Sequence, residues 1–169
     1  MKIGLVYSFN AIKTHQQAKK IVKAFGKGAD IEEVDAMTAQ PADITKYDNL
    51  IFGIPTWFDG ELPSYWDELL PGLSHEAFAG KKIALYGGGD QKGYPENFVD
   101  GLGLMANFLE QRGAILVGFT STEGYTFERS KALRDHKFVG LALDIENQSG
   151  LTTTRIEEWV AQLMKEFKK

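Results

Sequence analysis

The sequence predicts an α/β fold in which helices cover both faces of a doubly wound, five-stranded parallel sheet. Short apolar runs alternate with longer segments of helical periodicity along most of the chain. The run at residues 49–54 is apolar on both faces, as expected of a central parallel strand. Five such strands, joined by right-handed crossovers, suit the order 2-1-3-4-5, which places a ligand crevice beside the first strand.

The first half of the chain contains three predicted strands, at residues 2–8, 31–34 and 49–54. After the first strand, Ala18, Ile21, Val22 and Phe25 recur at helical spacing, so a helix follows from about Thr14. The polar segment 36–46 indicates a loop with one helical turn, and a second helix is expected near 65–70.

The second half continues this alternation up to an interruption. We expect strands at 82–86 and 114–118, with a helix from 95 to 111 that Gly113 ends. The segment 119–136 has no clear period and is interpreted as an insertion, after which 138–143 resumes strand character. A closing helix at 152–167 carries Ile156, Trp159, Val160 and Leu163 on one face.

Composition limits the classes of function. The 169 residues predict one domain spanning 1–169, and the 43% apolar content is ordinary for a globular protein. The absence of cysteine excludes disulfides and thiolate metal sites, and a net charge of −4 argues against a general nucleic-acid binder. With no signal peptide or membrane-spanning run in the sequence, we expect a cytoplasmic monomer that binds neither membrane nor nucleic acid.

The first strand leads into a loop that lies at the carboxyl edge of the predicted sheet. Its residues are Ser8, Phe9, Asn10, Ala11, Ile12, Lys13 and Thr14. Backbone N–H groups, the Thr14 hydroxyl and the helix dipole are suited to a phosphate. The alternative is an ordinary helix start capped by Thr14 or Asn10. The segment is not a Walker loop, because Tyr7 and Ile12 occupy the positions of its two glycines.

Two further loops follow the third and fourth strands. The first contains Pro55, Thr56, Trp57, Phe58, Asp59 and Gly60, and the second contains Gly87, Gly88, Gly89, Asp90 and Tyr94. An aromatic side chain at the end of a strand can stack on a flat ligand, although Trp57 can equally cover the core. Glycines let the backbone approach a ligand closely, and the alternative for them is a flexible turn. Together the three loops predict a site for a flat, heteroaromatic, phosphorylated molecule, and no hydrolytic triad accompanies them.

The chain resembles flavodoxin, specifically its long-chain form, over nearly all of its length. The matching segments are residues 55–57 with 60–62, 89–94 with 97–98, 121–125, 137–144 and 147–149. The insertion at 119–136 falls where long-chain flavodoxins interrupt their last strand. The resemblance implies a low-potential one-electron carrier, not an enzyme, that holds one FMN non-covalently.

The resemblance also implies roles for individual residues. Trp57 and Tyr94 would enclose the isoalloxazine ring, and backbone groups of Gly89, Asp90 and the 58–60 turn would contact its polar edges. Asn97 and Glu146 would lie near the flavin or its ribityl chain. The acidic residues expected around the site are Asp59, Glu61, Asp67, Glu68, Glu96, Asp100, Glu123 and Glu146. They would steer the protein toward transient redox partners with basic patches.

The first loop departs from the family pattern Ser/Thr-x-Thr-Gly-x-Thr. Two of the three hydroxyls are absent, and Ile12 replaces the glycine, which would strain the backbone if that position needs a positive φ. Each lost hydrogen bond to a charged group costs roughly 1.5–3 kcal/mol. Lys13 or His15 could compensate by direct charge. The alternative hypothesis is an altered ligand choice, either riboflavin or no flavin.

Overall fold

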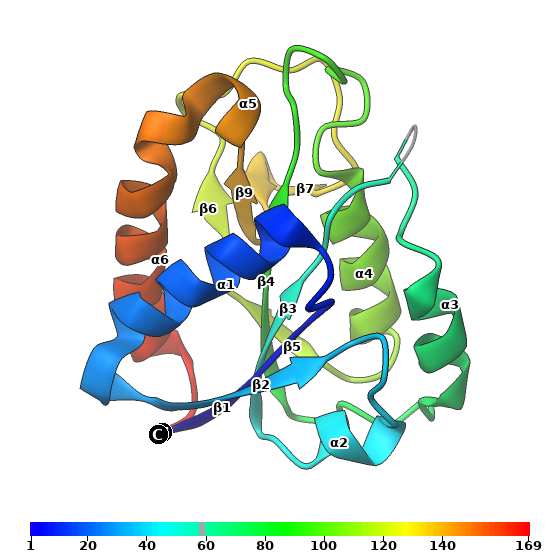
Figure 1. Cartoon of the computed structure of the whole chain (residues 1–169). Helices are drawn as coiled ribbons and strands as arrows, with labels where there is room; N and C mark the ends of the chain where they lie inside the picture. Colours follow the sequence, from blue (N-terminus) through cyan, green and yellow to red (C-terminus); the bar gives the residue numbers. More distant parts are fainter. Residues whose placement is uncertain (58–59) are drawn as a thin grey trace.

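The computed structural model describes residues 1–57 and 60–169, and its main sheet confirms the predicted fold class (Figure 1). Parallel pairing gives the order β2-β1-β3-β4-β5. The bounds of these strands are β1 Lys2–Tyr7, β2 Asp30–Asp35, β3 Asn49–Gly53, β4 Lys82–Gly88 and β5 Ile115–Val117. Each predicted strand lies within about two residues of its observed position.

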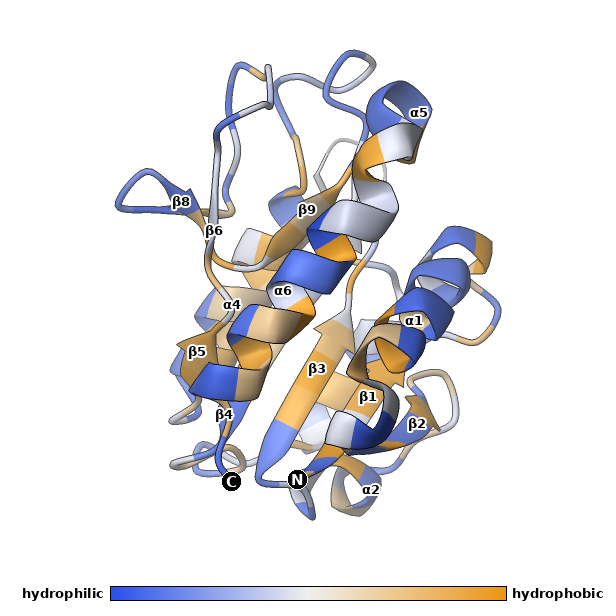
Figure 2. Ribbon diagram, turned by 90° about the vertical axis from the view of Figure 1, so that its left-hand side faces the viewer, coloured by the Kyte–Doolittle hydropathy of each residue, from blue (hydrophilic) through white to orange (hydrophobic). Residues whose placement is uncertain are grey.

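Helices cover both faces of the sheet. Their bounds are α1 Ile12–Phe25, α2 Pro41–Thr45, α3 Tyr65–Leu69, α4 Asp100–Glu110, α5 Ile145–Gln148 and α6 Thr152–Glu166, with short 3-10 turns at Gly26–Gly28, Leu70–Gly72 and Ser149–Leu151. Alternate strand residues point to opposite faces, so Leu5 packs with α1 and α6, whereas Val6 packs with α3 and α4. Figure 2 shows α1 and α6 on one side of the apolar strands. None of the described helices is long and apolar enough to cross a membrane.

The predicted strand at 138–143 is divided between two sheets, so its treatment as one strand was wrong. β8 (Lys137–Phe138) pairs antiparallel with β6 (Thr120–Ser121) and β7 (Leu133–Arg134). β9 (Leu141–Leu143) returns to the main sheet beside β4, as β5 does before it. Segment 119–136 therefore interrupts the last strand, as predicted.

Gly140, between β8 and β9, lies close to the backbone of β4. A Cβ at this residue would lie 2.2 Å from the carbonyl oxygen of Leu85 in β4. Only glycine lets the backbone come this close to the neighbouring strand. The chain passes from the small sheet into the main one at this point.

α4 begins later than predicted. Val99 has a φ of 48°, in the left-handed region, so a continuous helix cannot run from residue 95 through it. The segment before it forms turns, and the helix starts at Asp100. Gly113 ends the helical segment as predicted, with a φ of 86° and an N–H that donates to the Glu110 carbonyl at 3.1 Å.

Tyr86 connects the centre of the sheet to the start of α1. Its side chain is fully buried, and its hydroxyl donates to the Thr14 carbonyl at 3.0 Å. Gly53 on the adjacent strand makes room for this ring, because a Cβ there would lie 2.4 Å from the hydroxyl oxygen. The first turn of α1 is thereby fixed relative to β3 and β4.

We expect Tyr86→Phe to lower the free energy of unfolding by about 1 kcal/mol, because one buried hydrogen bond is lost while the ring is kept. Urea denaturation measures this change. Tyr94→Phe is the control, since that ring is 54% exposed. Equal stability of wild type and Tyr86→Phe would contradict the anchoring role.

Candidate functional site

Two adjoining cavities lie at the carboxyl edge of the sheet. The larger is about 260 Å³ and is lined by Lys13, Thr14, Gln17, Pro55, Thr56, Gly88, Gly89, Asp90, Tyr94, Leu143, Ile145 and Glu146. The smaller, about 130 Å³, is lined by Thr56, Gly89, Asp90, Tyr94, Asn97 and Val99. Four shared residues join the two into one crevice, which lies where parallel α/β sheets bind ligands.

The structure brings most of the predicted site residues to this crevice, with exceptions. Among the described residues, those that do not line either cavity are Ser8, Phe9, Asn10, Ala11, Ile12, Trp57, Gly60 and Gly87. Gly87 lies inside β4, where a Cβ would be 2.2 Å from the Ile54 carbonyl oxygen, so its small size serves packing. Phe58 and Asp59, both predicted for the site, lie outside the described residues.

The first loop ends in a helix start that uses no side-chain cap. Ala11 is the N-cap residue, so the prediction that Thr14 or Asn10 caps the helix was wrong. Ile12 opens α1 with ordinary helical backbone and a side chain that is 74% exposed, so the strain considered for this residue is absent. Within the described residues, no oxygen accepts from the amides of Ile12, Lys13 and Thr14. These amides are available to an anion.

Lys13 and His15, the two basic residues near this helix start, point to different places. Lys13 lines the crevice, and its Nζ forms an ion pair with Glu146. His15 instead lies 3.2 Å from the Tyr7 hydroxyl, and its ring contacts Phe9. Of these two residues, Lys13 is therefore the one placed to meet a negatively charged ligand group.

The second loop is folded back on itself at its aromatic residue. Trp57 and Glu61 exchange two backbone hydrogen bonds of 2.7 Å, and the Trp57 ring stands edge-on to Tyr65 at 5.9 Å. The Trp57 side chain remains 38% exposed. Gly60 has a φ of 99° and packs against Asp100, so the loop is held to the start of α4.

The carboxylate of Asp90 shapes the third loop. It accepts from the N–H groups of Lys92 and Gly93 at 3.1 and 2.7 Å and from the Asn147 side chain at 2.8 Å. These hydrogen bonds, that from Gly93 above all, hold the pKa of Asp90 below its ordinary value. Tyr94 is left at the rim of both cavities, 54% exposed, with a ring face available for stacking.

A buried hydrogen-bond network behind the crevice was missed by the site prediction. The Asp144 carboxylate accepts from the backbone and side chain of Gln91 at 3.1 and 2.7 Å and from the Asn147 backbone at 3.0 Å. Gln91 in turn accepts from the Thr126 N–H at 2.6 Å. Burial raises the pKa of Asp144, but the hydrogen bonds from Asn147 and Gln91 outweigh it, so the pKa lies below its ordinary value. One sequence signal was available for Asp144. It directly follows a predicted strand, and Asp is a common helix N-cap whose side chain accepts from the backbone N–H three residues later, here that of Asn147.

Gln17 was also missed, although it lines the larger cavity. It lies on the buried face of α1, between Thr14 and Ile21. The signal was a long polar residue among apolar residues at helical spacing.

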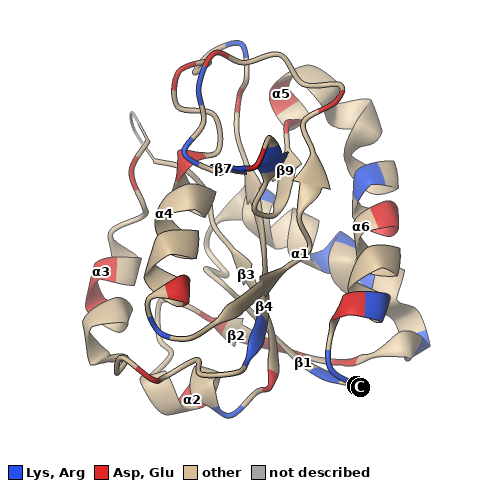
Figure 3. Cartoon of the chain, turned by 180° about the vertical axis from the view of Figure 1, so that it is seen from behind, with Lys and Arg blue, Asp and Glu red and all other residues tan. Residues whose placement is uncertain are grey.

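Acidic residues occur on α3 and on α5, where the ribbon is red in Figure 3. Those that are exposed at the predicted positions are Glu61, Asp67, Glu68, Glu96, Glu123 and Glu146. Asp100 does not belong to this surface, because it is 1% exposed and accepts from the Lys131 N–H at 2.7 Å.

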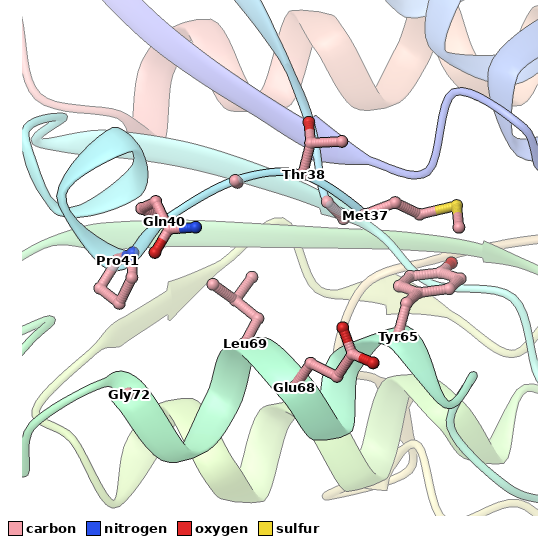
Figure 4. A pocket seen from close by; sticks show the side chains of 10 residues that line it. Met37, Thr38, Gln40, Pro41, Tyr65, Glu68, Leu69 and Gly72 are labelled. Carbon is pink, nitrogen blue, oxygen red and sulfur yellow. The ribbon is translucent and has the colours of Figure 1, made fainter.

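A separate cavity of about 400 Å³ lies between the loop after β2 and helix α3 (Figure 4). Its lining includes Met37, Gln40, Tyr65, Glu68 and Leu69. None of the predicted site residues that the structure describes lines this cavity. We assign the functional site to the crevice, where loops from several strands bring polar and aromatic groups together.

Comparisons with known proteins identify relatives of this chain. The sequence model of the flavodoxin family matches residues 6–159. The chain is 48% identical over 166 residues to a flavodoxin of Nostoc sp., covering 98% of this chain and 97% of that protein. It is 43% identical over 166 residues to flavodoxin 1 of Escherichia coli strain K12, covering 97% and 93%. A crystal structure of Fusobacterium nucleatum flavodoxin bound to flavin mononucleotide superposes with a TM-score of 0.92, at 34% identity and 99% coverage of each chain.

We expect Asp144→Asn to lower the free energy of unfolding at neutral pH by about 2 kcal/mol, since an amide group replaces an oxygen that accepts hydrogen bonds. The folded-state pKa of Asp144 is below its unfolded value of about 3.9. Its contribution is therefore full above about pH 4 and is lost as the pH falls through the folded pKa. Urea denaturation from pH 3 to 7 should show the difference between wild type and variant shrinking only below about pH 4.

Asp48→Asn is the matched control, because that side chain is 77% exposed, and we expect no comparable loss of stability. A stability difference for Asp144→Asn that stays constant through pH 3 would contradict the role of the ionised carboxylate.

Proposed function

Because this chain belongs to the flavodoxin family, we propose that it binds FMN non-covalently in the crevice and carries single electrons between redox proteins. The proposal treats residues 1–169 as one domain of the long-chain form. The observation that carries it is that the crevice combines an exposed aromatic ring with a positively charged helix start. The exposed ring of Tyr94 lines both cavities, whereas Lys13 and Thr14, whose amides are free, line only the larger one.

These residues suit the two ends of FMN. Tyr94, with Trp57 nearby, would stack on the isoalloxazine, and the backbone of Gly89 and Asp90 would contact its polar edge. The amides of residues 12–14, the Thr14 hydroxyl and Lys13 would hold the phosphate, since the helix dipole is positive there. The bound flavin supplies the one-electron chemistry, and the protein supplies binding, orientation and a negative surface.

Altered ligand choice is not favoured as an alternative. The hydroxyls absent from the first loop are side-chain donors, whereas the backbone amides of the helix start remain available. Ile12 leaves this geometry undisturbed, because its side chain points to solvent. Lys13 adds a positive charge at the same end of the crevice.

The partners we propose are redox proteins with basic patches, which a monomer of this chain meets transiently in the cytoplasm. The exposed acids on α3 and around the crevice support this proposal, because opposite charges steer encounter. Flavodoxin family membership favours a carrier over an enzyme.

We expect the flavin-free protein to bind FMN at least tenfold more tightly than riboflavin, because the phosphate adds charge-assisted hydrogen bonds. Quenching of flavin fluorescence during titration measures both affinities. The FMN-loaded protein should then pass electrons from a flavodoxin reductase to cytochrome c. If neither flavin binds, the proposed function is wrong.

Lys13→Gln should weaken FMN by about tenfold while leaving riboflavin nearly unchanged, since a charge-assisted hydrogen bond contributes roughly 1.5–3 kcal/mol. Lys23→Gln is the matched control, because Lys23 is exposed at the far end of the same helix. Equal losses for both ligands would show that Lys13 does not contact the phosphate.

Electron-transfer rates with a basic-patch partner should fall as ionic strength rises, because salt shortens the Debye length from about 30 Å at 0.01 M to about 8 Å at 0.15 M. Stopped-flow measurements across this range test the proposed steering. Rates that do not change with salt would argue against it.

A further inference from the structure

The side-chain amide of Gln17 is buried without hydrogen-bond partners in the described part of the chain. The residue is 3% exposed, and neither its Nε2 nor its Oε1 has a partner in the part of the chain that the structure describes. Burying an amide without partners costs roughly 1–3 kcal/mol. Among the described residues, the side chains with a buried polar atom that lacks a hydrogen-bond partner are Gln17, Tyr65, Trp66 and Thr152. Of these four, only Gln17 lines the crevice.

Its position within the crevice is specific. Gln17 lies one helical turn after Lys13 and Thr14, and its Nε2 would be 3.7 Å from a Cβ at Gly88. It lines the larger cavity with these residues and is absent from the lining of the smaller one, which holds Asn97. Gln17 therefore belongs to the larger cavity, one helical turn from the residues of the proposed phosphate end. A chain that links the phosphate to the ring would pass through this cavity.

The chemistry of the amide selects among the parts of a flavin. Its nitrogen needs an acceptor and its oxygen needs a donor. A phosphate dianion offers acceptors only, and the dimethylbenzene side of an isoalloxazine offers neither. The pyrimidine edge offers both, but the proposed partners of that edge are the backbone groups of Gly89 and Asp90. A chain of hydroxyl groups offers both to the same side chain.

We propose that Gln17 binds the polyhydroxyl chain of the cofactor, which in FMN and riboflavin is the ribityl group. The inference rests on the proposed function. The amide atoms are covered by neighbouring atoms, so contact requires the side chain to turn about its rotatable bonds, and no hydrogen bond holds it in place.

Three ligands separate this proposal from its alternatives. FMN has ring, polyol and phosphate, riboflavin lacks the phosphate, and lumiflavin has a methyl group in place of the whole chain. The variant is Gln17→Met, which keeps the length and removes both polar atoms. Gln16→Met is the matched control, because Gln16 is the exposed neighbour on the same helix. Fluorescence titration gives the dissociation constants for all three proteins.

We expect Gln17→Met to weaken FMN and riboflavin equally, by about tenfold each, and to leave lumiflavin unchanged within about twofold. The flavin-free variant should be at least as stable to urea as wild type, since an unpaired buried amide is removed. Gln16→Met should change none of these values.

Three results would overturn the proposal. A loss for FMN alone would place Gln17 on the phosphate. An equal loss that includes lumiflavin would place it on the ring or make its role one of packing, and no loss would leave it outside the site. If wild type binds no flavin, the proposed function itself fails. That failure is visible in the wild-type titration before any variant is made.

Discussion

The buried carboxylate of Asp144 is the interaction on which the candidate site depends. It accepts hydrogen bonds from the loop after β4 and from the start of α5, and Gln91 extends the network to Thr126 in the insertion. These segments are far apart in the sequence, and none belongs to a regular ladder at the points of contact. A buried carboxylate is stable only with such hydrogen-bond donors, which the loops supply. In return, the carboxylate fixes the positions of these loops.

The loop after β4 is therefore held from two directions. Asp90 organises its own turn and accepts from the same Asn147 side chain that contacts Asp144. Tyr94 then projects from a fixed backbone and stays exposed. Stacking on a flat ligand benefits from this arrangement, because the loop need not be ordered during binding.

The opposite end of the crevice relies on backbone and not on hydroxyl side chains. Tyr86 fixes the first turn of α1 through the Thr14 carbonyl, and the amides of that turn have no acceptors in the described part of the chain. Lys13 and Glu146 carry opposite charges across the same opening. This exposed ion pair contributes little to stability, so its members remain available to a ligand.

The sequence by itself determined the fold class, the strand order, the place of the insertion and most of the crevice lining. These follow from local periodicity and from the rule that parallel strands present their carboxyl ends at one edge. The helix bounds near Val99 and the division of residues 138–143 between two sheets were decided by tertiary structure. The left-handed backbone of Val99 and the close approach of Gly140 to β4 do not appear in the hydrophobic periodicity of the sequence.

Side-chain partners were decided by tertiary structure as well. The side chains of Asp144 and Gln91 are hydrogen-bonded although the two residues are 53 positions apart in the sequence. No sequence pattern indicates that they are close in space. Likewise, the pattern of α1 indicates that position 17 is buried, but only the packed structure shows that its amide has no partner and lines the crevice. Periodicity reports which face of an element is buried, whereas hydrogen-bond satisfaction depends on atoms that other segments bring.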